Sequence, residues 1–459
     1  MMFSIRTVLL LVTLTKGEPD ILCYQTTKYP PQTLFGSISP YPLDSIESIQ
    51  IPEKCQTAQL WLLSRHGTRH PSASIISKIS SLLKYNISKT NMCEEDKIAI
   101  NNWKPTNLTE EDAHELNDQG ILDMYRFGKR IRKTFIELFN KSYDYQVLSS
   151  PKSRCLYSAK HFINGLFNTT VIKDFDDIPI RKPNDTRLDL TIGRSLKHDN
   201  YTDWSSQVNQ FKNSFNIREV IRNVIQKIKN DDKENEYLVI DDILTMLDSC
   251  KYEKTWHLET RPAWCAVFSQ NDLQTLEYLD DLKRYYNNAY GNQDNEWLGC
   301  PLVKDMITSF KKKIERSEGP KGVFYFGHSS NLLSLITRLG LFNDTEPITA
   351  DNFDKMKNRK FRASFIDTFA SNLMVALYKC EDGDYKVSFY INEKPVKFGD
   401  EEGCYDCPWK KIENQFNSII SDKKCLFENE QSSSSNICYK SLYLLFLCIY
   451  VTVMNRFND

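Results

Sequence analysis

Residues 59–71 read QLWLLSRHGTRHP, a stretch that is apolar in its first half and basic in its second. The apolar half, 59–64, is short and rich in residues that favour strands, as in the interior of a parallel sheet. Two other stretches have the same form: 145–150 leads into a turn, and 322–327 leads directly into His328. Ligands of open α/β sheets bind beyond the carboxyl ends of the strands. We therefore predict three buried strands that deliver polar residues to one edge of a sheet.

Helical patterns separate these strands. Residues 110–139 are charged and carry apolar residues at helical spacing, and 332–341 follows the third strand as an amphipathic helix. Later strands are predicted at 373–380 and 385–391. The alternation of strand and helix indicates the α/β class, here a mostly parallel sheet flanked by helices.

The chain has 459 residues, which is enough for one large domain with an insertion. Residues 174–300 are charged, helical in pattern and poor in Val-rich runs. We predict that 174–300 forms a mainly helical inserted domain beside the sheet. Residues 23–173 and 301–425 would then form the α/β domain together.

The basic half of the opening stretch, 65–71, contains the residue types that a phosphate ester requires. A guanidinium group, such as that of Arg65 or Arg69, binds two phosphate oxygens at once and stays charged at any relevant pH. A neutral imidazole, here His66, can attack phosphorus and form a covalent intermediate. Gly67 permits a close approach of the backbone. This pattern predicts a phosphomonoester site with a nucleophilic histidine.

The segment 65–71 resembles the R-H-G-x-R-x-P signature of the histidine acid phosphatases, which include the phytases. Segment 149–155, SSPKSRC, is similar to the family segment that supplies a third phosphate-binding arginine, and 326–328, FGH, resembles the family's second histidine site. The resemblance implies the histidine-phosphatase fold, with His66 as the catalytic nucleophile. It also implies that the transferring phosphate is bound by Arg65, Arg69, Arg154 and the second catalytic histidine, His328.

A finer resemblance, from about residue 23 to residue 425, is to the multiple inositol polyphosphate phosphatases. It implies removal of phosphate from inositol polyphosphates such as inositol hexakisphosphate, through a phosphohistidine intermediate, with no metal and no other cofactor. The segments that carry it are 264–268, 277–282, 359–362, 370–373 and 377–380.

Basic residues for the other phosphates of such a substrate are expected in the segment shared with this branch. The candidates are Lys357, Arg359, Lys360 and Arg362. The lysines at 311–313 are interpreted instead as a solvated helix face.

Position 330 departs from the family. The superfamily carries His-Asp at the second site and the inositol branch His-Ala-Glu, whose carboxylic acid protonates the leaving oxygen; this chain has His328, Ser329 and Ser330. A serine hydroxyl is too weak an acid to replace a carboxyl group, and a general acid contributes roughly 100- to 10,000-fold in rate. Three interpretations stay open: another acid acts with a water held by Ser330 as relay, turnover is slow, or the protein binds polyphosphates without cleaving them. Asp351 and Asp354 are near in sequence, but sequence gives no distance to the leaving oxygen.

Two alternative functions follow from the same residues. A general acid phosphatase for small phosphomonoesters is favoured if the insertion contributes few lysines to the site. A non-catalytic phosphate-binding protein is favoured by Ser330, whereas the intact His66 and motif arginines favour an enzyme. The formal net charge of −1 provides no global basic field for nucleic acid, which we exclude as a partner.

The N-terminus predicts export. Arg6, the apolar run 8–14 and the small Gly17 have the order of a signal peptide, which we place at 1–17. The chain has 13 cysteines, and all but Cys448 lie where they can pair in an oxidising compartment. The lone C-x-x-C at 404–407 is interpreted as a disulfide rather than a zinc site, because no second pair or histidine lies near it.

N-x-S/T sequons behind a signal peptide predict glycosylation. They lie at Asn86, Asn107, Asn140, Asn168, Asn184, Asn200 and Asn343.

The C-terminus, 432–459, is predicted to be a spacer followed by an apolar anchor signal. The apolar run 442–454 is too short to span a bilayer comfortably, and the serines at 432–435 before it resemble the attachment site of a GPI signal. The polar ending 455–459 is atypical of such a signal. A GPI-anchored cell-surface protein, a short stop-transfer helix and an unanchored secreted chain therefore stay open.

Overall fold

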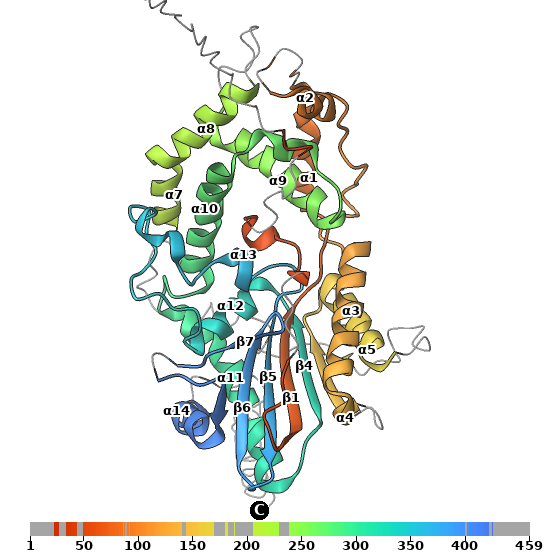
Figure 1. The fold of residues 1–459 in the computed structure, drawn as a ribbon, viewed down its shortest axis with the longest axis vertical. Coiled ribbons are helices and arrows are strands. Elements are labelled where there is room, and N and C mark those ends of the chain that lie inside the picture. Colours follow the sequence, from red (N-terminus) through yellow and green to blue (C-terminus); the bar gives the residue numbers. More distant parts are fainter. Residues whose placement is uncertain are drawn as a thin grey trace, which may run out of the picture.

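The computed structural model describes residues 23–26, 34–43, 49–85, 87, 90, 92–139, 144–168, 180–181, 188, 205–228, 238–399, 402–421 and 425. Strands form one eight-stranded sheet in the order β3-β2-β4-β1-β5-β6-β7, with β8 paired to β6 (Figure 1). Their bounds are β1 (Cys55–Arg65), β2 (Tyr145–Ser149), β3 (Ile180–Arg181), β4 (Gly322–Gly327), β5 (Asn372–Cys380), β6 (Tyr385–Ile391), β7 (Lys394–Val396) and β8 (Asp406–Pro408).

The sheet is mixed, with its parallel part at the predicted site. β3, β2, β4 and β1 pair in parallel, whereas β5 pairs with β1, and β6 with β5, in antiparallel. The predicted class and the predicted strands are therefore confirmed, and β4 has the predicted bounds. The carboxyl ends of β1, β2 and β4 lie at one edge, because Arg65 pairs with Gly327, and Ser149 with Phe326.

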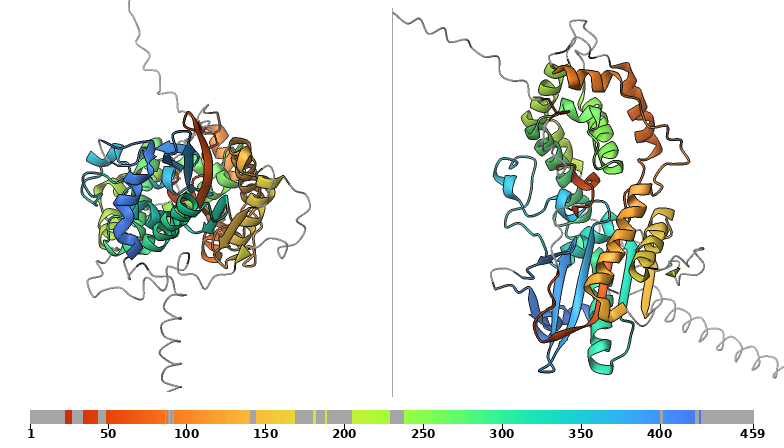
Figure 2. Two further views of the ribbon diagram at one scale, coloured as in Figure 1. Left: turned by 90° about the horizontal axis from the view of Figure 1, so that it is seen from below. Right: turned by 45° about the vertical axis from the view of Figure 1, so that its right-hand side comes forward.

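Helices cover both faces of the sheet. α3 (Asp118–Thr134), α4 (Ile136–Phe139) and α5 (Ser153–Phe167) lie on one side, and α11 (Asp294–Arg316), α12 (Ser329–Arg338) and α14 (Trp409–Ser421) on the other (Figures 1 and 2). Side chains of a strand alternate between faces. Leu60 and Leu62 accordingly join the core cluster of α3 and α5, whereas Trp61 and Leu63 join that of α11 and α12.

The predicted helix over 110–139 is shorter in the structure. α3 begins at Asp118, where the Asn117 side chain accepts a hydrogen bond from Gly120 N at 2.9 Å. This is ordinary N-capping by an Asn side chain. The residues before Asn117 turn back instead, and Glu115 O accepts a hydrogen bond from His70 N at 2.9 Å. Segment 110–117 thereby stabilises the loop that follows β1.

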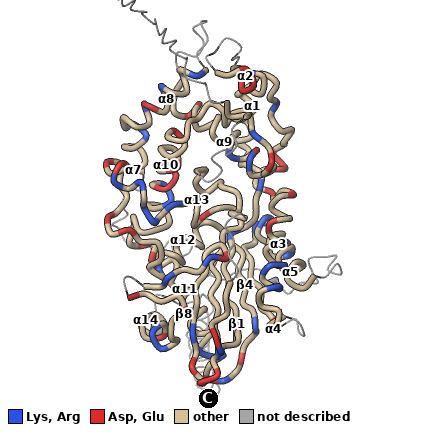
Figure 3. The backbone as a smooth tube through the Cα atoms, in the orientation of Figure 1, with Lys and Arg blue, Asp and Glu red and all other residues tan. Residues whose placement is uncertain are grey.

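A helical part lies beyond the carboxyl edge of the parallel strands, at the top of Figure 1. It contains α1 (Ala73–Ser80), α2 (Glu94–Asn101), α7 (Ser205–Lys212), α8 (Phe215–Ile228), α9 (Ile240–Trp256), η6 (Ala263–Val267) and α10 (Gln270–Asn288). α1 packs on α9, and α2 on η6, although α1 and α2 precede residue 174. α11 runs without a break through residue 300 and packs on α12. Basic and acidic residues are interspersed along the described backbone of both parts (Figure 3).

Disulfides join Cys23 to Cys93, Cys55 to Cys380, Cys250 to Cys265, Cys300 to Cys425 and Cys404 to Cys407. The C-x-x-C pair is thus a disulfide, as predicted. Cys155 is a free, buried cysteine. A framework of this kind is typical of a secreted or lumenal protein.

Several predictions fall outside the described residues: the signal peptide at 1–17, the C-terminal segment 432–459, and the sequons at Asn86, Asn140, Asn184 and Asn200. The sequon residues Asn107, Asn168 and Asn343 are exposed. Among the helices that the structure describes, none has the length and apolar character needed to cross a membrane.

Candidate active site

The loop after β1 is held where three strand ends meet. His66 N donates a hydrogen bond to Gly327 O at 3.0 Å, which joins the end of β1 to the end of β4. Ser150 N donates to Phe326 O at 2.8 Å, which joins the end of β2 to β4. The structure therefore brings His66, His328 and the start of α5 together from three distant segments. The two imidazole rings lie edge to face with their centroids 5.8 Å apart.

The shape of this loop depends on two glycines. A Cβ on Gly67 would lie 2.7 Å from Gly120 O, and a Cβ on Gly120 would lie 2.1 Å from Thr68 O. No side chain is tolerated at such distances from a backbone oxygen, so the loop and the start of α3 are in direct backbone contact. Thr68 Oγ1 donates to Asp123 Oδ2 at 3.0 Å, which anchors the loop to α3.

His66 is arranged as a nucleophile. Its Nδ1 lies 2.9 Å from Gly67 O. Because a carbonyl oxygen only accepts, Nδ1 carries the proton and Nε2 holds the lone pair. Burial lowers the pKa of His66 well below its ordinary value, and Arg65, Arg69, Arg154 and His328 lower it further. The ring is therefore neutral and nucleophilic over the whole physiological pH range.

Arg65, Arg69 and Arg154 converge on the two histidines, since all three lower the pKa values of both rings. Arg154 comes from the first turn of α5. Arg65 Nη1 donates to Ser37 O and Asp367 O, both at 2.6 Å, and Arg69 Nη1 donates to His70 O at 2.6 Å. The Nε atoms of all three are buried without a hydrogen-bond partner among the described residues. Unsatisfied guanidinium groups around a nucleophile are suited to an anion with several acceptor oxygens.

His328 faces the same site from the end of β4. Its Nε2 lies 3.0 Å from Ser150 Oγ, and Cys155 Sγ lies 3.8 Å from both ring nitrogens. Burial lowers the pKa of His328 to about 3, with Arg154, Arg65 and Arg69 as further causes. The ring is therefore neutral in the empty site and can donate a single hydrogen bond to a phosphate oxygen.

Ser330 lies in the first turn of α12, and its hydroxyl has no hydrogen-bond partner among the described residues. Its neighbour Ser329 is bonded: Ser329 Oγ donates to Asp367 Oδ2 at 2.5 Å. Asp367 ends the short helix α13 (Ala363–Ile366) and is completely buried. Asp351 and Asp354 are at the surface, where Asp351 accepts from Gln210 and Asp354 pairs with Lys357.

Three residues at this site were missed by the sequence analysis: Ser37 from η1 (Gly36–Ile38), Arg284 from α10, and Asp367. Arg284 Nη2 donates to Ser37 Oγ at 2.6 Å, and Arg284 Nε lies 4.0 Å from Asp367 Oδ2. Arg65 contacts the same two residues, so Arg284 and Arg65 are neighbours. These residues come from three segments far apart in the chain and carry no local motif.

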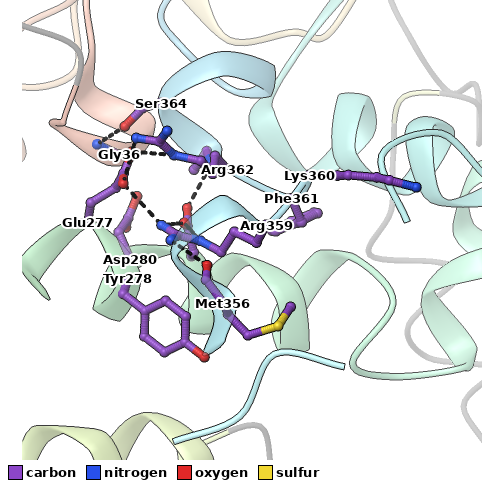
Figure 4. Close-up of polar contacts among 12 residues, drawn as sticks. Gly36, Glu277, Tyr278, Asp280, Met356, Arg359, Lys360, Phe361, Arg362 and Ser364 are labelled. Atoms are coloured by element: carbon purple, nitrogen blue, oxygen red, sulfur yellow. Dashed lines mark hydrogen bonds and ion pairs between the residues drawn. The ribbon is translucent and has the colours of Figure 1, made fainter. Parts of the chain in front are cut away.

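Two of the candidate phosphate ligands are engaged elsewhere. The Arg359 side chain is 3% exposed, and it donates to Asp281 Oδ2 at 2.7 Å and to Glu277 Oε2 at 3.0 Å. Figure 4 shows Arg359 beside Glu277 and Arg362. Arg362 donates to Glu277 Oε1 at 2.9 Å. These arginines join the segment after η7 (Lys355–Asn358) to α10, and their charges are neutralised there. These contacts contradict the expectation that Arg359 binds substrate; for Arg362, whose side chain is 23% exposed, substrate binding stays a prediction. Lys360 points away from this cluster in Figure 4.

A family model described as the histidine phosphatase superfamily (branch 2) matches residues 58–392. This chain belongs to that superfamily. The multiple inositol polyphosphate phosphatase 1 of Drosophila melanogaster is 29% identical over 446 residues, covering 91% of this chain and 92% of that protein. The protein of the same name from Gallus gallus is 29% identical over 377 residues, covering 76% and 79%.

Two solved structures share the fold of this histidine phosphatase. The phytase from D. castellii matches with a TM-score of 0.71 and 17% identity, covering 88% of this chain and 91% of that one. A multiple inositol polyphosphate phosphatase from Bifidobacterium longum, complexed with inositol hexasulfate, matches with a TM-score of 0.63 and 13% identity, covering 85% and 98%.

Among the described residues of this histidine phosphatase, potential metal ligands lie close enough together to hold one ion at Cys23, Cys93 and Glu95. The two sulfurs form a disulfide, which removes the thiolates that a metal would need.

Proposed function

We propose that the protein is a phosphomonoesterase that removes phosphate from inositol polyphosphates, such as inositol hexakisphosphate, through a phosphohistidine intermediate. The observation that carries the proposal is the neutral His66, whose Nδ1 proton is held by Gly67 O and whose Nε2 has no hydrogen-bond partner among the described residues. The relatives are named as inositol polyphosphate phosphatases, and the structural neighbours as a phytase and such a phosphatase, which supports this substrate class.

The first chemical step follows from these residues. Arg65, Arg69, Arg154 and His328 bind the oxygens of the transferring phosphoryl group, whose charge is spread over three equatorial oxygens in the transition state. His66 Nε2 attacks phosphorus, and the charge that develops meets donors already oriented toward it. Because burial and three arginines keep both histidines neutral, the folded site has the protonation state that nucleophilic attack requires.

The helical part supplies further cations for the other phosphates of the substrate. Lys251 on α9 is 6% exposed, and its ammonium group has no hydrogen-bond or ion-pair partner among the described residues. Burial lowers the pKa of Lys251, and Arg284 lowers it further, whereas Asp280 and Asp248 raise it. A largely buried ammonium group that no described carboxylate contacts directly, with Asp280 and Asp248 acting on it from farther away, favours a polyphosphate over a small phosphomonoester.

A second candidate function is a phosphate-binding protein that no longer cleaves its ligand. The observation that favours it is Ser330, at the position where the family has its proton donor. The ligand site would be the same in both cases, so the two functions differ only in turnover.

The disulfides are typical of a secreted or lumenal compartment. Within this proposal, residues 1–17 are a removable signal peptide, the seven predicted sequons are glycosylated, and 432–459 directs a GPI anchor. The domain division at 174–300 is also part of the proposal. The packing of α1 on α9 and of α2 on η6 supports adding 73–101 to the helical side.

The test measures phosphate release from inositol hexakisphosphate by the purified ectodomain between about pH 4 and pH 7. Native turnover that is abolished in His66→Ala, together with a phosphohistidine trapped by alkaline quench in the native chain, supports the enzyme. A native chain that binds the compound but releases no phosphate, and that is activated by Ser330→Glu, supports the binding protein instead.

A further inference from the structure

Asp367 connects the two halves of the site. Its Oδ1 lies 3.5 Å from Nη1 of Arg65, the residue before the nucleophile. Its Oδ2 accepts the hydrogen bond of Ser329, the residue after the second histidine, at 2.5 Å. Its Oδ1 is buried without a hydrogen bond among the described residues. Asp367 is thus a buried carboxyl group one hydrogen bond from the segment where the family's proton donor is missing.

The charged and titratable groups that face Asp367 come from two elements. β1 contributes Arg65, and α10 contributes Arg284 and, at greater distance, Asp280. α12 contributes only the hydroxyl of Ser329. Burial raises the pKa of Asp367, Asp280 raises it further, and the two arginines and Ser329 oppose this rise. The carboxyl group therefore binds a proton more readily than an ordinary aspartate.

Substrate strengthens this tendency. A bound phosphate group brings negative charge to Arg65 and shares its guanidinium group with Asp367. A neighbouring negative charge favours the neutral form of a carboxyl group. Asp367 is consequently most readily protonated when a phosphate ester occupies the site.

We propose that Asp367 is the proton source for the leaving group and passes its proton through the Ser329 hydroxyl, in place of the carboxyl group absent at position 330. This proposal rests on the proposed function. Asp367 is fully buried and Ser329 is 9% exposed, so Ser329 is the member of the pair that can reach the substrate side.

The step balances without any other reactant. His66 Nε2 forms a bond to phosphorus while the bond from phosphorus to the ester oxygen breaks, and that oxygen takes the electron pair. When Asp367 is protonated, its Oδ2 donates the hydrogen bond to Ser329 Oγ, which turns the Ser329 hydroxyl proton toward the departing oxygen. Ser329 gives that proton to the oxygen and receives the proton of Asp367, which is left as a carboxylate that again accepts from Ser329. In the second step water attacks the phosphohistidine, the bond from phosphorus to nitrogen breaks, and the proton lost by water returns through Ser329 to Asp367.

Other described groups at the site are poorer donors. His328 is neutral because burial lowers its pKa to about 3. Burial raises the pKa of the Cys155 thiol to about 12, which makes it a weak acid. The Ser330 hydroxyl has no acidic partner to replace a proton that it gives away.

The experiment compares two substrates that differ in their need for a proton. The leaving group of inositol hexakisphosphate is an inositol alkoxide, which requires an acid, whereas the leaving group of 2,4-dinitrophenyl phosphate is stable without one. We expect Asp367→Asn and Ser329→Ala each to reduce kcat/KM on inositol hexakisphosphate about 100-fold or more, and to change kcat/KM on the dinitrophenyl ester less than about threefold, because kcat/KM covers only the steps up to departure of the leaving group. In the native chain kcat/KM on inositol hexakisphosphate should fall as the pH rises and Asp367 loses its proton, and this fall should be absent in Asp367→Asn. The matched control is Asp351→Asn, which removes a surface carboxylate bound to Gln210.

Ser330→Glu in the Asp367→Asn background should restore turnover of inositol hexakisphosphate, because it returns a carboxyl group to the family position. Equal losses on both substrates would mean that Asp367 only holds Arg65 in place, and unchanged kinetics would mean that another group is the acid; either result overturns the proposal. A native chain that cleaves only the dinitrophenyl ester overturns it as well. A native chain that cleaves neither ester contradicts the proposed enzyme itself.

Discussion

Two groups of buried and half-buried arginines, one around the two histidines and one bound to carboxylates of α10, behave differently. Arg65, Arg69 and Arg154 surround the two histidines with few carboxylates to balance them. Arg359 and Arg362 are neutralised by Glu277 and Asp281. Both groups lie in segments that resemble the same family, so sequence alone assigned phosphate binding to both. The comparison shows that the balance of charge around a buried arginine, rather than its burial, distinguishes an anion site from a structural ion pair.

The largest effect is expected in the neutralised group. Arg359→Met leaves the buried Asp281 carboxylate without its ion-pair partner and Glu277 with Arg362 alone, and breaking a buried ion pair costs roughly 3–5 kcal/mol in the free energy of unfolding. Denaturant titration measures this loss. Lys357→Met is the control, because the Lys357 side chain is 61% exposed and should change stability by less than about 0.5 kcal/mol. A variant of Arg359 with native stability and weakened substrate binding would reverse the distinction between the groups.

For Arg69→Gln we expect a loss of activity without a loss of stability, the opposite of the result for Arg359→Met. Removing one donor from a preorganised anion site typically costs about 2.7–4 kcal/mol of transition-state stabilisation, which is a 10²–10³-fold loss of kcat. Thermal stability should be unchanged or raised, because the change relieves repulsion among the cations. Steady-state kinetics and thermal melting of the same preparation provide both values. A large loss of stability would place Arg69 with the structural group.

The pH dependence of stability gives a third, smaller effect. Below about pH 6.5 the unfolded chain binds protons on its histidines. The folded chain keeps His328 neutral down to its pKa of about 3 and keeps the pKa of His66 well below its ordinary value. The free energy of unfolding should therefore fall as the pH falls from 6.5, by up to about 1.4 kcal/mol per pH unit for each histidine.

His328→Asn should make this slope shallower by about the contribution of one histidine. Denaturant titrations at pH 4.5, 5.5 and 6.5 measure it. Parallel curves for the two chains would show that the site does not oppose protonation of His328.

The smallest effect is expected at Lys251. Lys251→Met should weaken binding of inositol hexasulfate about tenfold, since a hydrogen bond to a charged group is worth about 1.5–3 kcal/mol and solvent reduces it. The stability of the folded chain should change little, because the desolvation of the Lys251 ammonium group is relieved while Asp280 and Asp248 lose a nearby positive charge. Calorimetric titration of Lys251→Met beside Lys312→Met, an exposed lysine on α11, measures the difference. Equal affinities would exclude Lys251 from the substrate site.

The sequence predicted what local pattern determines. Each of these features is determined by one short segment of sequence: the strands at 145–150 and 322–327, the loop 65–71 and the start of α5. The sheet then brings the ends of these segments together. Ser37, Arg284 and Asp367 were not predictable, because their role depends on contacts among three distant segments. The error at Arg359 has the same origin: the carboxylates that neutralise it lie on α10, about 80 residues earlier in the chain.

The free thiol of Cys155 has a consequence for how the protein matures. The described cysteines other than Cys155 are paired, so this chain acquires its bonds in surroundings that oxidise thiols. Disulfide exchange requires a thiolate, and burial raises the pKa of Cys155 to about 12, so the finished protein is inert to exchange at this position. Before α5 docks against His328, the same thiol is accessible and can form a disulfide with the wrong cysteine. Docking of α5 against His328 therefore completes the catalytic centre and protects the thiol from mispairing in one event.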